Sequence, residues 1–147
     1  MKKILIAFDG SPTSEKAAEK AIDIAKRYGS EVTFISVVDV PLTNVYDSTA
    51  IDLPIEYSKV TKRIVFLRIQ ILNTFIDKID CEGIIVKKVV LPGVPYEEII
   101  NYAKEESFDL IVMGRRGFSK IKRFFVGSET QRVISDSPCN VLVVNEV

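Results

Sequence analysis

DLIVMGRRGFSKIKRFFVGSET, residues 109–130, joins a short apolar run to a basic loop framed by glycines and then to the start of a helix. The run DLIVM (109–113) is continuous and apolar, which predicts a buried strand. Ser128 begins the helix, and Gln131 three residues later completes a capping-box pattern, so Ser128 is expected to cap it. A strand, a loop and a helix in this order are typical of an α/β fold.

The same alternation of apolar runs and amphipathic segments extends over the rest of the chain. Further strands are predicted at ILIAF (4–8), EVTFISVVD (31–39), GIIVKKVVL (83–91) and NVLVV (140–144). The first helix has Ser11 as its cap and Pro12 in its first position, and Gly29 ends it. A loop is predicted at 40–55, and a later helix opens at Pro95. Between these two, a long helix is predicted from apolar residues spaced three or four apart: Val60, Ile64, Leu67, Ile71, Phe75 and Ile79.

Five strands separated by helices predict one α/β domain spanning residues 1–147. Right-handed crossovers give a Rossmann-like parallel sheet with helices on both faces, and we expect the strand order 3-2-1-4-5. Lys87 and Lys88 suit an edge strand, which agrees with an outer place for the third strand. Ligands bind such sheets beyond the carboxyl ends of the strands, where the strand order reverses. The loops FDGSPTS and GRRGFSK, after the first and fourth strands, are therefore the candidate binding loops.

The loop after the fourth strand has the composition of a phosphate site. Gly114, Gly117 and Gly127 allow positive φ angles or a close approach of main-chain amides to an anion. The helix that begins at Ser128 adds unpaired N–H groups and the positive end of its dipole. Five basic side chains supply local charge: Arg115, Arg116, Lys120, Lys122 and Arg123. The GK[ST] element of a Walker loop is absent, and no GxGxxG follows a strand. A solvated surface loop without a ligand remains the alternative.

Composition excludes several classes of protein. The 147 residues carry 20 basic and 20 acidic side chains, so no net charge favours nucleic acid or an acidic membrane. The chain has no histidine, which excludes His-based triads and histidine metal sites. No apolar run approaches the roughly 18 residues of a membrane span, and the N-terminus lacks the pattern of a signal peptide. We therefore expect a cytoplasmic protein that binds neither membrane nor nucleic acid.

Residues 112–144 resemble the signature region of the universal stress protein family. Members of its ATP-binding branch carry Gly-x2-Gly-x9-Gly-[Ser/Thr] after the fourth strand, and the three glycines of this chain have that spacing. The similarity extends over ILIAFDGSPTSEKAAEKAIDIAK and GVPYEEIINYAKEESFDLIVMG, and it covers nearly the whole chain apart from 43–60. The resemblance implies a five-stranded fold that binds ATP between the ends of the first and fourth strands. It also implies a homodimer and a role in stress responses.

The resemblance assigns roles to individual residues of this chain. It implies that Asp9 contacts the ribose or a bound Mg²⁺ or Mn²⁺, and that the main chain of Val37 contacts the adenine edge. Beside the adenosine it implies Ala7 and Phe8, beside the ribose Met113 and Gly114, and at the phosphates Gly117, Gly127, Ser128 and Thr130. Arg115 and Arg116 lie between the first two glycines of the motif.

Glu129 departs from the family pattern, because many ATP-binding members have valine there. A carboxylate at this position would repel a triphosphate unless it turned outward or a cation intervened. It could also be a favourable acid in the first turn of its helix. The sequence alone does not decide whether Glu129 faces the phosphates or only stabilises its helix.

The leading hypothesis is a cytosolic ATP-binding regulator with at most weak hydrolysis. One alternative is a slow Mg²⁺-dependent ATPase that uses Asp9. Another is a nucleotide-free dimeric protein whose loop contacts a protein partner, and nucleic-acid binding is the weakest. We expect homodimerisation through the last strand, NVLVV, because an apolar edge strand invites pairing with a second chain.

Overall fold

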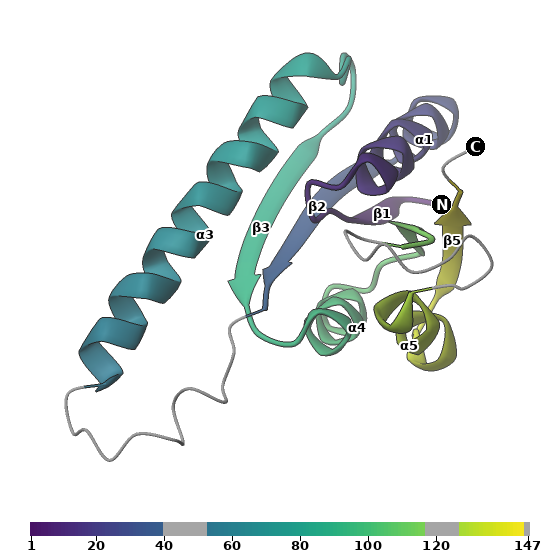
Figure 1. The fold of residues 1–147 in the computed structure, drawn as a ribbon. Coiled ribbons are helices and arrows are strands. Elements are labelled where there is room, and N and C mark those ends of the chain that lie inside the picture. Colours follow the sequence, from purple (N-terminus) through teal and green to yellow (C-terminus); the bar gives the residue numbers. More distant parts are fainter. Residues whose placement is uncertain (40–52, 117–126, 146–147) are drawn as a thin grey trace.

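The structure of this protein is a computed structural model that describes residues 1–39, 53–116 and 127–145, with the backbone alone described for 53–58. Its elements follow one another in the predicted alternation (Figure 1): β1 (Lys3–Ala7), α1 (Pro12–Tyr28), β2 (Glu31–Val38), α3 (Leu53–Lys78), β3 (Val86–Pro92), α4 (Pro95–Glu105), β4 (Leu110–Gly114), α5 (Ser128–Asp136) and β5 (Asn140–Val144). The long helix begins at Leu53, slightly before the predicted end of the loop at 40–55. The remainder of that loop, 40–52, lies outside the described residues.

The five strands form one parallel sheet in the order β3-β2-β1-β4-β5, as predicted. Because β1 and β4 are neighbours in the sheet but not in the chain, the strand order reverses between them. The two outer strands are β3 and β5. Lys87 and Lys88 are exposed on β3, which confirms that lysines mark an edge strand here.

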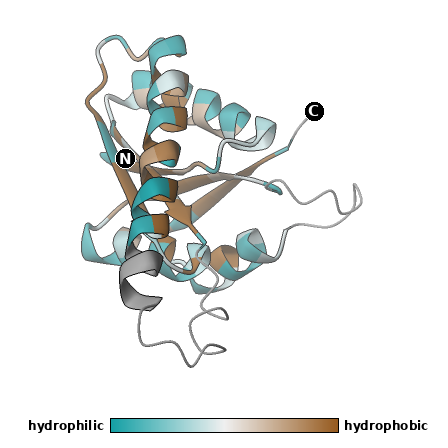
Figure 2. Ribbon diagram, turned by 60° about the vertical axis from the view of Figure 1, so that its left-hand side comes forward, coloured by the Kyte–Doolittle hydropathy of each residue, from teal (hydrophilic) through white to brown (hydrophobic). Residues whose placement is uncertain are grey.

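Helices cover both faces of the sheet, and each face has its own apolar core. Alternate residues of β1 point to opposite faces, so Ile4 and Ile6 pack with α1 and α3, whereas Leu5 packs with α4 and α5. Figure 2 shows the predominantly hydrophobic strands between helices whose surfaces are mixed. On the first face, Phe8 and Phe34 pack edge to face with ring centres 6.1 Å apart. These layers hold the ends of β1 and β4 in fixed positions.

The buried side of α3 agrees with the predicted stripe only near the end of the helix. Three residues of the predicted apolar stripe, Val60, Leu67 and Ile71, are about half exposed. The helix buries Leu72, which lies outside the stripe, and the stripe residues Phe75 and Ile79 pack against the same core as predicted. Helix α3 lies along β3, at one edge of the sheet (Figure 1), and only part of the predicted stripe reaches the core. None of the helices that the structure describes combines the length and hydropathy of a membrane span.

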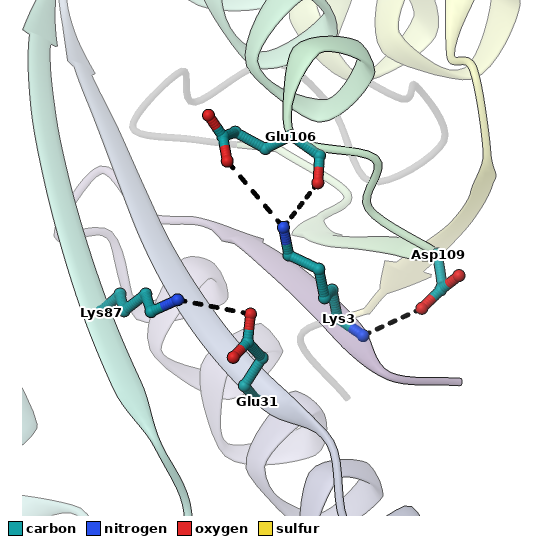
Figure 3. Close-up of polar contacts among 5 residues, drawn as sticks. All are labelled: Lys3, Glu31, Lys87, Glu106 and Asp109. Atoms are coloured by element: carbon teal, nitrogen blue, oxygen red, sulfur yellow. Dashed lines mark hydrogen bonds and ion pairs between the residues drawn. The ribbon is translucent and has the colours of Figure 1, made fainter.

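Polar contacts fix the amino ends of the strands, at the end of the sheet opposite the candidate loops. Asp109 accepts hydrogen bonds through Oδ2 from the backbone N–H groups of Lys2 and Lys3, at 2.7 and 2.9 Å. These bonds hold the pKa of Asp109 below its ordinary value. Figure 3 shows the bond from the Lys3 N–H to Asp109 together with the ion pairs Lys3–Glu106 and Lys87–Glu31. The bonds of Asp109 tie β1 to the start of β4, and the Lys87–Glu31 pair ties β3 to β2. The Lys3–Glu106 pair ties β1 to the end of α4.

Candidate functional site

A cleft of about 160 Å³ opens beyond the carboxyl ends of β1 and β4, where the strand order reverses. This is the position that general rules for open α/β sheets assign to a ligand. The wall of the cleft includes the following described residues: Ala7, Phe8, Asp9, Ser11, Ser14, Ile35, Val37, Pro95, Ile99, Met113, Gly114, Arg116, Glu129 and Thr130. One part of the wall is apolar and comes from β1, β2, β4 and α4. The other part is polar and comes from the helix starts.

The turn from β1 into α1 is fixed by its own side chains. The N–H of Ser11 donates to Asp9 Oδ1 at 2.8 Å, so one carboxylate oxygen of Asp9 is used within the turn. The Oγ of Ser11 accepts from the N–H of Ser14 at 3.2 Å, which confirms the predicted cap, and Pro12 occupies the first turn of α1. The left-handed Gly10, at φ 85°, lets the chain reverse between them. The turn therefore presents Asp9 to the cleft in a fixed orientation.

Gly114, the last residue of β4, is required by close packing. A Cβ at this position would lie 2.6 Å from Thr13 Cγ2 and 3.1 Å from the backbone carbonyl carbon of Thr13. The carbonyl of Gly114 accepts a 3.0 Å hydrogen bond from Thr130 Oγ1, which joins the end of β4 to the first turn of α5. Thr130, predicted as a phosphate contact, is buried and its hydroxyl makes this bond. The first glycine of the motif thus brings α1, β4 and α5 together.

The two ends of the glycine loop meet at its base. The N–H of Gly127 donates to the carbonyl of Arg115 at 2.9 Å, and the N–H of Arg115 donates to Val144 of β5. Residues 117–126 lie outside the described part of the chain, and with them the predicted Gly117 and the basic residues Lys120, Lys122 and Arg123. The loop is therefore closed where it leaves β4 and where it enters α5.

The prediction that Ser128 caps α5 is wrong. Gly127 is the N-cap, with no side-chain cap bond, and the exposed Ser128 is the first helical residue. The capping-box pattern failed because the helix begins at Ser128, one residue earlier than a Ser128 cap requires. Gly127 has an ordinary φ of −58°, and a Cβ there would meet nothing closer than 3.5 Å. Gly127 therefore lacks a positive φ, and packing in the described structure does not require a glycine there, so a close approach to an anion is the expected reason that stays a prediction.

Glu129 is tied to a different helix from its own. Its Oε2 accepts a 2.8 Å hydrogen bond from the N–H of Tyr96, the second residue of α4. The N-cap of α4 is Val94, which cannot supply a side-chain acceptor. Glu129 therefore performs the capping role for α4 from α5, and its carboxylate is not turned out to solvent. Sequence alone did not indicate this contact, because the two residues are 33 positions apart.

Most of the predicted site residues lie in the cleft wall, but three described ones do not. Arg115, Gly127 and Ser128 lie at the base of the loop and are not part of the wall. The wall also includes residues that sequence reasoning did not assign to the site: Ser11, Ser14, Ile35, Pro95 and Ile99. Local signals identified Ser11 and Pro95 only as helix starts. Their place in the cleft follows from the packing of α1 and α4 on the sheet.

The charges that line the described wall are two carboxylates and one guanidinium, from Asp9, Glu129 and Arg116. Among the residues that the structure describes, no three side chains of the metal-binding types are grouped to hold a metal ion. Asp9, the predicted metal contact, offers one carboxylate. Mg²⁺ is commonly held in this way by one or two carboxylates together with the phosphates of a ligand.

Comparison with known proteins gives a consistent family. A model of the universal stress protein family matches residues 1–145. Universal stress protein MJ0531 of Methanocaldococcus jannaschii is 38% identical over 147 residues, covering 99% of this chain and 82% of that protein. Universal stress protein YxiE of Bacillus subtilis is 31% identical and covers 97% of both chains. The solved structure of hypothetical protein MJ0577 has a TM-score of 0.85 at 27% identity, covering 98% of this chain and 95% of that one.

Two further solved structures of the same fold contain nucleotides. One is a universal stress protein in complex with cAMP, with a TM-score of 0.68 at 20% identity, covering 99% of this chain and 98% of that one. The other is a universal stress protein from Archaeoglobus fulgidus in complex with dAMP, with a TM-score of 0.56 at 21% identity and 98% coverage of both chains. At these identities the likeness establishes the fold.

Proposed function

This chain belongs to the universal stress protein family, and we propose that it binds an adenine nucleotide in the cleft beyond β1 and β4. The observation that carries the proposal is the cleft itself, which lies at the reversal of strand order and combines an apolar wall with polar helix starts. Ligand pockets typically have this composition, mostly apolar with a few convergent polar groups.

The two parts of the wall suit the two parts of a nucleotide. Ile35, Val37, Ile99 and Met113 offer an apolar surface on which a purine ring could pack. Asp9 is held by the Ser11 N–H through one oxygen, which leaves the other as an acceptor for a ribose hydroxyl or a ligand to a cation.

The phosphates are assigned to the α5 side of the cleft. Arg116 lies in the wall there, and α5 begins beside it with Gly127 and the exposed Ser128. Anions are favoured at the N-terminus of a helix by its unpaired amides and its dipole. The spacing of Gly114, Gly117 and Gly127 supports ATP as one candidate ligand. The cAMP and dAMP complexes of proteins with this fold make monophosphates equally worth testing.

We assign a regulatory binding role and not a dedicated catalytic one. The chain has no histidine to act as a base. The two carboxylates in the described wall each accept a backbone N–H: Asp9 from Ser11 and Glu129 from Tyr96. One oxygen of each carboxylate is therefore already engaged in a hydrogen bond within the fold. Any hydrolysis with Asp9 and Mg²⁺ would be slow.

The test combines identification of a resident ligand with calorimetry. Mass spectrometry of the material released by heat from freshly purified protein should find an adenine nucleotide. Arg116→Gln should weaken ATP binding about fivefold, more strongly at low salt, because the lost charge faces the ligand. Arg27→Gln, which removes an exposed charge at the far end of α1, is the matched control and should leave binding unchanged.

Two outcomes would count against nucleotide binding. One is that heating releases no adenine compound, and the other is that wild type binds neither ATP nor adenosine at millimolar concentration. Together these results would favour the nucleotide-free, partner-binding alternative. Equal effects of Arg116→Gln and Arg27→Gln would instead mean that the phosphates do not bind on the α5 side of the cleft.

A further inference from the structure

Glu129 places a fixed negative charge in the wall of the cleft. It is the second residue of α5, it is half-buried, and its Oε2 accepts the Tyr96 N–H at 2.8 Å. The bond satisfies an amide at the start of α4 that would otherwise lack an acceptor within its helix. The carboxylate therefore gains both a hydrogen bond and the favourable end of a helix dipole by staying where it is.

Neighbouring contacts hold Glu129 in this position from both sides. One turn further along α5, the guanidinium carbon of Arg132 lies 4.6 Å from the centre of the Tyr96 ring, a cation–π contact. On the other side, Thr130 Oγ1 donates to the carbonyl of Gly114 at 3.0 Å. The first turn of α5 is thus bonded to α4 and to β4. Swinging the carboxylate out to solvent would leave the Tyr96 N–H unsatisfied.

The charge matters because of what it faces. The described wall contains Asp9 and Glu129 against one guanidinium, that of Arg116. A ligand whose phosphates approach Ser128 at the start of α5 brings its negative charge close to Glu129, the second residue of that helix. The repulsion grows with the number of phosphate charges and vanishes for a neutral nucleoside. A divalent cation bound to the phosphates would reverse it.

We propose that Glu129 sets which adenine ligand the cleft accepts, favouring adenosine and its monophosphates over a triphosphate unless a divalent cation accompanies the triphosphate. The inference rests on the proposed function and names the ligand class of the same site. The Glu129 carboxylate, which also caps α4, selects ligands by the number of their phosphate charges. The capping bond keeps the selecting charge in place.

Three variants separate the charge of Glu129 from its capping bond. Glu129→Gln removes the charge but keeps an amide oxygen that can accept the Tyr96 N–H. Glu129→Val removes both. Glu97→Gln is the matched control, because Glu97 is an exposed acid in the first turn of α4 that does not line the cleft. It changes the net charge of the protein by the same amount.

The measurement is calorimetry of each variant with adenosine, AMP and ATP, the last with and without Mg²⁺. Glu129→Gln should tighten metal-free ATP at least about tenfold, equivalent to about 1.4 kcal/mol. AMP should gain less, and adenosine should stay within about twofold. Added Mg²⁺ should shrink the gain for ATP. Glu97→Gln should leave all affinities unchanged. The melting temperature should stay near wild type in Glu129→Gln and fall in Glu129→Val, which loses the cap.

The outcomes distinguish this inference from the proposed function. If adenosine binds but Glu129→Gln leaves the ratio of ATP to adenosine affinity unchanged, the charge inference is wrong and the binding site stands. An equal gain in Glu97→Gln would also overturn it, because the effect would then be one of net charge. If no adenine compound binds wild type or Glu129→Gln, both proposals fail. ATP binding that appears only in Glu129→Gln would support the inference.

Discussion

Gly114→Ala tests whether the first glycine of the motif is required by packing. A Cβ at this position would lie 2.6 Å from Thr13 Cγ2, 3.0 Å from Thr13 Cβ and 3.1 Å from its backbone carbonyl carbon. Rotation of the Thr13 side chain can relieve the first contact but not the last. Both Gly114 and Thr13 are buried, so α1 must move away from β4 to accept the methyl group.

The expected cost follows from this geometry. Overpacking a well-packed core typically costs 1–3 kcal/mol, and a contact with the backbone favours the upper part, about 2–3 kcal/mol. For a chain of this size, that loss lowers the melting temperature by roughly 4–12 °C. Urea denaturation followed by circular dichroism should show a lower midpoint with an unchanged m-value.

Two comparisons make the test specific. Gly127→Ala adds the same methyl group where φ is −58° and the nearest atom would be 3.5 Å away, so its stability should stay within about 0.5 kcal/mol of wild type. Thr13→Ser removes Cγ2 and keeps the hydroxyl, and it should reduce the cost of Gly114→Ala by about 1 kcal/mol. The packing argument is refuted if Gly114→Ala is as stable as Gly127→Ala, or if Thr13→Ser does not reduce its cost.

Two further predictions concern the amino end of the central strand β4 and the edge strand β5. Asp109 has a lowered pKa in the folded state, so its contribution to stability is present above the ordinary value of 3.8 and is lost as pH falls through the folded pKa. Asp109→Asn should therefore destabilise the protein at neutral pH, and the difference from wild type should shrink below about pH 4. The exposed Asp136→Asn is its control, and a difference that does not change with pH would contradict the linkage. Wild type should sediment as a dimer at micromolar concentration, and Val143→Lys on the edge strand β5 should weaken association at least about tenfold. Asn101→Lys, exposed on α4, should not affect association, and a monomeric wild type would exclude the dimer.

The sequence by itself determined the order and type of the elements. Short apolar runs separated by amphipathic segments predicted five parallel strands, and the exposed Lys87 and Lys88 marked β3 as an edge strand. Helix starts at Ser11 with Pro12 and at Pro95 were also visible. These features depend on residues close together in the chain. The region of the cleft followed as well, because the ends of β1 and β4 are its floor in any sheet of this order.

Tertiary structure alone decided which side chains meet. The apolar stripe predicted for α3 includes Leu67 and Ile71, yet the helix buries Leu72, because its position over the sheet edge selects the inner face. Ile35 and Ile99 entered the cleft wall through the packing of β2 and α4. Periodicity fixes which residues share a face of an element, but not how that face is rotated against its neighbours.

Glu129 illustrates the same limit at the candidate site. The sequence identified it as a departure from the family pattern and left its direction open. Its bond to the Tyr96 N–H exists because α4 and α5 pack side by side on one face of the sheet, with the open first turn of α4 beside the first turn of α5. An unpaired amide at a helix start takes whichever acceptor the fold brings within reach, and that acceptor lies 33 residues away in the chain.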